Sequence, residues 1–202
     1  MKYLKIILLI VIIVNGYVSF ATIKKIGFHN MTFTEFKQAC KNQNHRLTEA
    51  RKITNNLRDD FTGNCTDSNH QKKIKDLVNE ILPCFDNNSQ PNEADLETIY
   101  QNITRNLCFH YDIVKQHQAN QNCFNGKDKV HKCQLAHYRK NKNISTGKLF
   151  LTLGMTHSHQ ECNFIKIRIE CSSSGNVTSC PREFQVKRDN LINNYVSNLK
   201  CA

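Results

Sequence analysis

The sequence contains little proline and glycine, with three and seven residues respectively among 202. Both residues mark turns and linkers, and no stretch of proline, glycine or serine is long enough here to separate two domains. Long apolar runs are also scarce. The longest spans residues 6–14 and is shorter than the ~20 residues that a membrane helix needs. These absences argue against a membrane protein and predict a single domain.

The apolar run near the start has another interpretation. A short basic segment, residues 1–5, precedes it, and the small residues Ser19 and Ala21 follow at the positions that a signal peptidase recognises. This pattern predicts a secretory signal peptide over residues 1–21, cleaved after Ala21. We therefore expect a secreted, extracellular protein whose mature domain spans residues 22–202.

Common catalytic motifs are absent, including Gly-x-Ser-x-Gly and His-Glu-x-x-His. His110 and Asp112 faintly resemble the active-site helix of secreted phospholipases. However, Tyr111 separates them, and the adjacent cysteines and glycine-rich calcium loop of that family are missing. Nine histidines are compatible with a ribonuclease but no motif supports one. The sequence predicts a protein that is not an enzyme and has no catalytic residues, with a secreted hydrolase as a remote alternative.

Histidine and cysteine provide one weak metal candidate. His157, His159 and Cys162 offer nitrogen and sulfur ligands, which zinc favours. In an oxidising compartment the Cys162 thiol is expected to be bonded instead. His131 and His137 are too far apart for one helical face without a third element. We therefore expect no metal site and no cofactor.

Cysteine, in contrast, is abundant. The even number, ten, in a secreted chain predicts five disulfides and no free thiol, although the sequence does not choose the pairing. The bonded residues are Cys40, Cys65, Cys84, Cys108, Cys123, Cys133, Cys162, Cys171, Cys180 and Cys201.

Asn-x-Ser/Thr sequons add to the extracellular prediction. Six occur, and we discount the one at Asn64 because Cys65, in its middle, is expected to be bridged. The five candidate glycosylation sites, of which we expect a subset to be occupied, are Asn30, Asn87, Asn102, Asn143 and Asn176.

Apolar residues recur at helical spacing through most of the mature chain. Thr32 and Glu35 form a capping-box pair at the first segment, Gly63 follows the second and Pro83 stops the third. The expected helical segments are 33–40, 47–61, 74–82, 96–114, 127–141 and 182–199. Residues 148–153 form an apolar run that could be a buried strand and residues 164–169 alternate as strands do, so the segment 148–171 suits a short β-hairpin or two helices. The predicted fold class is mainly α, a single disulfide-stapled helical domain with a possible hairpin near 148–171.

Several residues together resemble an insect secreted family, the twenty-seven-kilodalton hemolymph glycoproteins. They are Phe36 with Cys40, Leu82-Pro83-Cys84, Leu107-Cys108, Cys123-Phe124 and Lys132-Cys133, followed by the spacing of the last four cysteines. The resemblance implies a secreted, helical, disulfide-bonded, non-enzymatic glycoprotein of extracellular fluid. The basic bias and the segment 148–171 depart from the family pattern, which leaves a shared role in doubt.

Basic residues are concentrated late in the chain. Residues 22–126 have a net charge of +1, whereas residues 127–202 have +8. The candidate polyanion-binding residues are Lys127, Lys129, Lys132, Arg139, Lys140 and Lys142. Such a face suits sulfated glycan or anionic membrane, which gives an alternative function: a salivary or venom effector or toxin. A solvated surface is the simpler interpretation, and nucleic acid is not an expected partner.

Apolar stripes on a helical bundle also suit carriage of a small apolar ligand between helices. The candidate lining residues are Phe33, Phe36, Leu96, Tyr100, Ile103 and Tyr111. Core packing is the simpler role for them. The predicted function is thus a non-enzymatic extracellular-fluid protein with a possible apolar ligand.

Overall fold

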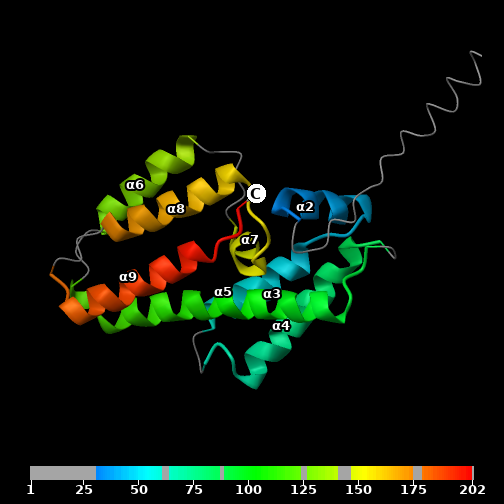
Figure 1. Ribbon diagram of the computed structural model, residues 1–202, viewed down its shortest axis with the longest axis horizontal. Coiled ribbons are helices and arrows are strands. Elements are labelled where there is room, and N and C mark those ends of the chain that lie inside the picture. Colours follow the sequence, from blue (N-terminus) through cyan, green and yellow to red (C-terminus); the bar gives the residue numbers. More distant parts are fainter. Residues whose placement is uncertain are drawn as a thin grey trace, which may run out of the picture.

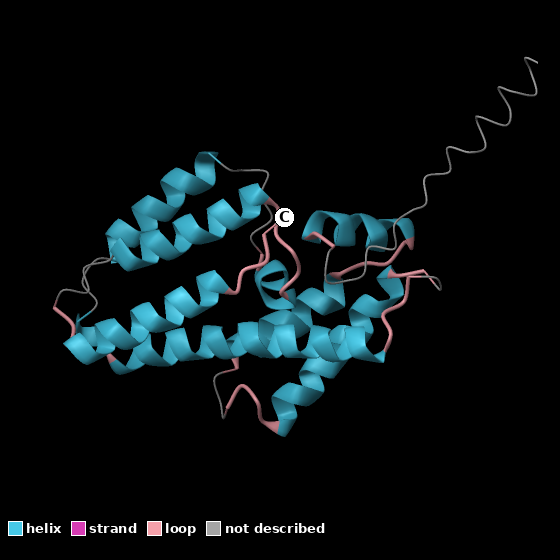
Figure 2. Cartoon of the chain, viewed as in Figure 1, coloured by secondary structure: helices cyan, strands magenta, loops and turns pink. Residues whose placement is uncertain are grey.

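A computed structural model describes residues 31–60, 64–86, 89–123, 127–140, 147–174 and 179–201. Within these ranges the chain forms eight α-helices in one domain, and its only β-structure is two isolated bridges, Thr32 with Thr156 and His157 with Cys201 (Figures 1 and 2). The α-helices are α2 (Phe33–Asn42), α3 (Thr48–Asp59), α4 (Ser68–Ile81), α5 (Glu93–Ala119), α6 (Lys127–Lys140), α7 (Lys148–Leu153), α8 (His159–Ser174) and α9 (Arg182–Ser197). The mainly α fold class is confirmed.

Local sequence explains where several helices begin and end. Thr32 and Glu35 form the expected capping box of α2, and Asn92 with Asp95 forms a second one at α5. Helix α4 ends at Ile81, where Pro83 lies in a short 3-10 turn, Leu82–Cys84. Phe61 and Gly63, expected at the end of the second helix, lie outside the described residues, as does the predicted signal peptide. None of the described helices is long and apolar enough to cross a membrane.

Residues 148–171 form helices, so the suggested hairpin is wrong. Gly154, with φ +64°, ends α7, and a Cβ at this position would lie 2.5 Å from the Asn106 side chain. Glu161 then accepts a hydrogen bond from the Ser158 amide (2.8 Å) at the start of α8. On α8, Phe164, Ile165 and Ile169 are at least half-buried and lie on one side. The alternation of apolar and polar residues that suggested a strand therefore reflects one buried face of helix α8.

The main core lies among α2, α3, α4, α5 and α7. The 27-residue helix α5 runs through the molecule as a spine, and α9 lies along it (Figure 1). The α4 and α5 residues with no exposed surface include Ile74, Leu77, Val78, Ile81, Ile99, Ile103 and Leu107. Burying such side chains contributes about 1.5–3 kcal/mol each before entropic costs, so this packing is the main stabilising element of the fold.

All ten cysteines are paired, as predicted. The five bonds are Cys40–Cys84, Cys65–Cys108, Cys123–Cys180, Cys133–Cys171 and Cys162–Cys201. Each bond joins separate elements: the fourth links α6 to α8, and the fifth holds the C-terminal tail on the start of α8. No bond connects a cysteine before position 109 with one after it.

The candidate glycosylation sites fare differently. Asn102 is only 4% exposed and its side chain accepts a hydrogen bond from Arg105, which argues against a glycan at this position. It packs where α7 ends, since a Cβ on Gly154 would lie 3.1 Å from the Cβ of Asn102. A glycan there would separate α5 from α7. Asn30, Asn87, Asn143 and Asn176 lie outside the described residues.

Candidate functional site

Two adjoining cavities lie beside α5, on the side that faces α8 and α9. The first, about 160 Å³, is lined mostly by apolar side chains, and we name it the apolar cavity. The second, about 210 Å³, has charged and amide groups from α5, α9 and the tail, and we name it the polar cavity. The described residues that line the apolar cavity are Arg58, Asn106, Phe109, His110, Ile113, Gln134, Phe150, Leu151, Phe164, Ile165, Arg168, Ile169 and Tyr195.

A stacked aromatic pair separates the two cavities. The rings of Phe109 on α5 and Tyr195 on α9 are nearly parallel, with an interplanar angle of 9° and centroids 3.9 Å apart. Both residues and Asn106 line both cavities. Ligand pockets usually begin near ~300 Å³, a size that neither cavity reaches alone but that the two exceed together. The stacking of Phe109 on Tyr195 therefore determines whether a ligand can occupy one cavity or both.

Helical spacing explains the apolar wall. Phe109 and Ile113 are four residues apart on α5, and Ile165 and Ile169 are four apart on α8, so each pair presents one face to the cavity. Phe150 of α7 lines the cavity as well. The wall is thus formed by α5, which runs through the core, and by α8, which packs mainly on α6.

Arg58 and His110 supply polar groups at the apolar cavity. The Arg58 Nη2 donates to His110 Nδ1 (2.9 Å), and His110 Nε2 donates to the Arg58 carbonyl (3.1 Å). Burial, with the positive charge of Arg58, lowers the His110 pKa to about 4. The imidazole is therefore neutral at physiological pH and holds the guanidinium in place. Burial also lowers the Arg58 pKa, with a smaller contribution from the like charge of Arg168.

The positive charges of three arginines act on the Tyr195 hydroxyl. Burial raises the Tyr195 pKa, and the positive charges of Arg58, Arg105 and Arg168 oppose that rise. They come from α3, α5 and α8, whereas Tyr195 lies on α9. The fold therefore concentrates positive charge from distant parts of the sequence around one aromatic side chain.

The polar cavity contains a buried histidine. His157 is 3% exposed, and its Nδ1 has no hydrogen-bond partner among the described residues. Its ring packs edge-on against Phe150 with centroids 4.7 Å apart, and burial lowers its pKa. Arg105, Asp112 and Lys200 line the same cavity, so its polar groups are of mixed charge.

The residues predicted to line a ligand pocket lie elsewhere. Phe33, Phe36 and Ile103 are core residues, and Leu96 and Tyr100 pack against that core. Tyr111 is buried, with its hydroxyl against the His70 ring and 3.2 Å from the Leu57 carbonyl. The α5 residues predicted to line a pocket lie on the face of the helix that packs into the core. Phe109 and Ile113 lie on another face of the same helix, and their spacing was the sequence signal that could have predicted the cavity.

Two polar groupings among the described residues lie away from the cavities or are divided between them. Asp67, His70 and Tyr111 form a hydrogen-bonded series, but the His70 and Tyr111 side chains are buried and line none of the cavities described. His110 pairs with Arg58, while Asp112 lines the other cavity.

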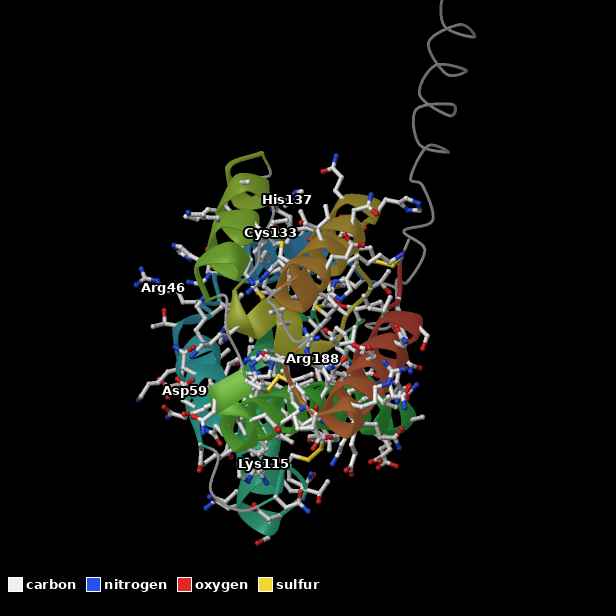
Figure 3. All side chains as sticks on the ribbon, turned by 90° about the vertical axis from the view of Figure 1, so that its left-hand side faces the viewer. Arg46, Asp59, Lys115, Cys133, His137 and Arg188 are labelled. Carbon is white, nitrogen blue, oxygen red and sulfur yellow. A yellow bond between two sulfur atoms is a disulfide. The ribbon has the colours of Figure 1, made fainter. Side chains whose placement is uncertain are left out.

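The metal candidates lack thiolates. Cys162 is bonded to Cys201, so it does not offer a ligand to His157 and His159. Ligand atoms of Cys133, His137 and Cys171 lie within 4.8 Å of one another (Figure 3), but the two sulfurs form a disulfide. These groups do not fit a zinc site in the oxidised protein.

The basic segment forms the expected helix, α6. Within it, Lys132 is exposed. The side chains of Lys127, Lys129, Arg139 and Lys140 lie outside the described part of the structure, as does the whole of Lys142. A different basic surface lies between α2 and α3, where a shallow groove of about 390 Å³ is lined by Lys37, Lys41, Arg46 and Arg51 and by no carboxylate among the residues that the structure describes.

Comparison with protein-family models, curated proteins and solved structures finds no match for this chain. The conclusions about the site therefore depend on its geometry and chemistry.

Proposed function

We propose that this protein is a secreted, non-enzymatic protein of extracellular fluid that carries a small apolar ligand. The observation behind the proposal is the apolar cavity of about 160 Å³ between α5 and α8. An engineered apolar cavity of about 150 Å³ stays dry and binds benzene. A cavity of this size therefore suits a ligand with a body about as large as one aromatic ring.

Two further features support the extracellular part of the proposal. Five disulfides are typical of proteins that fold in an oxidising compartment. The cysteine spacing resembles that of the insect hemolymph glycoproteins, which implies a non-enzymatic role in extracellular fluid. The predicted signal peptide at residues 1–21 agrees with both.

The test measures binding of a neutral probe, 2-phenylethanol, by saturation-transfer nuclear magnetic resonance. We expect binding by the wild-type protein and its loss in Ile113→Trp, which fills the apolar cavity. Val186→Trp is the matched control, because Val186 is exposed on α9 and should keep wild-type binding. Absence of probe binding to the wild type, or equal binding by both variants, would reject the carrier function.

Exposed Lys132 on α6 supports a second candidate, a salivary or venom effector that acts on sulfated glycans or anionic membranes. The net charge of +8 over residues 127–202 would attract such partners over several ångströms. Retention on heparin at physiological salt distinguishes this function from the carrier function. A protein that elutes below physiological salt does not act in this way.

A further inference from the structure

We propose that the ligand is a small apolar carboxylate, with its body among the side chains of Phe109, Phe164 and Ile165 and its carboxylate against Arg58 and Arg168. This inference rests on the proposed function and names the chemical class of its ligand. Three features support it: the charge of the apolar cavity, the hydrogen bonds of Arg58 and the size of the space.

The charge of the apolar cavity has one sign. Among the described residues, two arginines line it and no aspartate or glutamate does. The other titratable groups that the described part of the chain contributes to its lining are His110, which is neutral at physiological pH, and Tyr195. An anion that enters would meet two guanidinium groups and no carboxylate in the wall.

Arg58 is oriented by neutral partners. Two hydrogen bonds of its guanidinium go to His110 Nδ1 (2.9 Å) and to Thr152 Oγ1 (3.5 Å). Within the described residues, no carboxylate forms an ion pair with it. A guanidinium has five N–H donors, so these bonds fix its direction and leave donors for a ligand. The arrangement resembles a pre-oriented anion receptor more than a completed internal ion pair.

A bound carboxylate would also relieve an unfavourable interaction. Arg58 and Arg168 line the same cavity, and after burial the positive charge of Arg168 also contributes to the lowering of the Arg58 pKa. Guanidinium and carboxylate are both planar and pair through two parallel hydrogen bonds. An anion between α3 and α8 would therefore link two helices that hold like charges.

The apolar wall decides between kinds of anion. Moving a multiply charged phosphate or sulfate into a space lined by phenylalanine and isoleucine carries a large desolvation cost. A carboxylate has one charge, and its attached hydrocarbon gains from burial at about 25 cal/mol per Å². The cavity volume limits that hydrocarbon to about one aromatic ring or a short chain, unless the stack of Phe109 and Tyr195 opens.

The experiment compares phenylacetate with the neutral 2-phenylethanol on the whole mature protein by isothermal titration calorimetry. We expect wild type to bind phenylacetate at least tenfold more tightly. Arg168→Gln should reduce the preference to threefold or less while leaving 2-phenylethanol binding unchanged. Arg168→Lys, which keeps the charge but not the planar fork, should retain part of the preference. Circular dichroism and thermal midpoints establish that each variant is folded.

Arg46→Gln is the matched control. Arg46 is exposed and lines the basic groove between α2 and α3 rather than the apolar cavity. It tests whether phenylacetate is held by general attraction to positive charge, and we expect it to keep the wild-type preference. A loss of preference equal to that of Arg168→Gln would overturn the inference.

The outcomes separate this inference from the proposed function. Equal affinity of wild type for the two probes would overturn the carboxylate inference but leave the apolar carrier in place. Failure of both probes to bind would reject the two together. If Arg168→Gln does not fold, Arg168→Lys becomes the deciding variant. If Arg168→Lys keeps the full wild-type preference for phenylacetate, the carboxylate is not recognised by a planar guanidinium at this position, and that part of the inference is overturned.

Discussion

Helices α2 to α5 and helices α6, α8 and α9 are held in different ways. The first group, in residues 31–119, buries a continuous set of isoleucine, leucine and phenylalanine side chains and contains two disulfides. The second group, in residues 121–201, contains three disulfides, and in α9 only Phe184 and Arg188 are buried. We name these the N-terminal region and the C-terminal region.

This difference explains where the cavities occur. The N-terminal region is closed, together with α7, by apolar packing, whereas the three bridges of the C-terminal region lie within that region and only a modest apolar face holds it against α5. Space therefore remains where the two regions meet, at Phe109, Ile113 and Tyr195. The C-terminal region also has most of the excess positive charge. Cross-links permit looser packing because they stabilise a fold largely by restricting the unfolded chain.

Reduction of the disulfides should have the largest effect. Loss of one native bridge typically costs about 2–5 kcal/mol, and the C-terminal region has three bridges with a small core to compensate. We expect α6, α8 and α9 to lose amide protection in hydrogen exchange after reduction, while α4 and α5 stay protected. Simultaneous loss of protection in all helices would contradict the distinction between the two regions.

Core truncation should destabilise the N-terminal region strongly. Leu77 has no exposed surface on α4, so Leu77→Ala should lower the free energy of unfolding by about 2–5 kcal/mol in urea denaturation. Val186→Ala on α9 is the matched control, and its effect should stay within about 0.5 kcal/mol because Val186 is exposed. Equal losses for both substitutions would mean that α9 contributes to the core.

Acid should lower the stability of the fold through buried histidines on and beside α5. Burial lowers the pKa of His110 to about 4, and it also lowers the pKa values of His117 and His157. These groups stay neutral in the fold but take up protons on unfolding near pH 6.5. Their contribution to stability is therefore full above pH 6.5 and falls as the pH decreases toward 4.

The measurement is the thermal midpoint from pH 7.5 to 4. His110→Gln cannot titrate at this position, so its midpoint should fall less steeply than that of the wild type between pH 6.5 and 4. Parallel curves for the two proteins would contradict the assignment of a depressed pKa to His110. His131→Gln, at an exposed position on α6, is the control, and its curve should match that of the wild type.

The basic surface should give the smallest effect. If α6 binds polyanions, Lys132→Ala should weaken retention on heparin or anionic vesicles by about 1 kcal/mol and change stability by less than about 0.5 kcal/mol. Lys75→Ala, at an exposed position on α4, is the control for net charge. A larger loss from Lys41→Ala than from Lys132→Ala would move the polyanion surface to the groove in the N-terminal region.

Local sequence patterns were enough to predict the helical class, most helix boundaries and the pairing of all cysteines in disulfides. Thr32 with Glu35 and the proline at position 83 act within a turn of the helix, so their effects are visible in the local sequence. An even cysteine count in an oxidising compartment needs no spatial information. The local sequence did not decide the structure of α8, because Phe164 to Ile169 suits a strand or a helix. In the fold, the turn at Gly154 and the Cys133–Cys171 bond restrict this segment to a helix.

Only the tertiary structure decided the disulfide pairing, the burial of Asn102 and the place of the cavities. Phe109 and Tyr195 stack although 86 positions separate them, and Arg58 meets His110 from another helix. Helical periodicity predicts that α5 has apolar faces, but Leu107 and Phe109 are equally apolar neighbours in the sequence. One enters the core and the other lines the cavities because of what packs against each face. Those neighbours come from distant segments, whose meeting depends on the free energy of the whole fold.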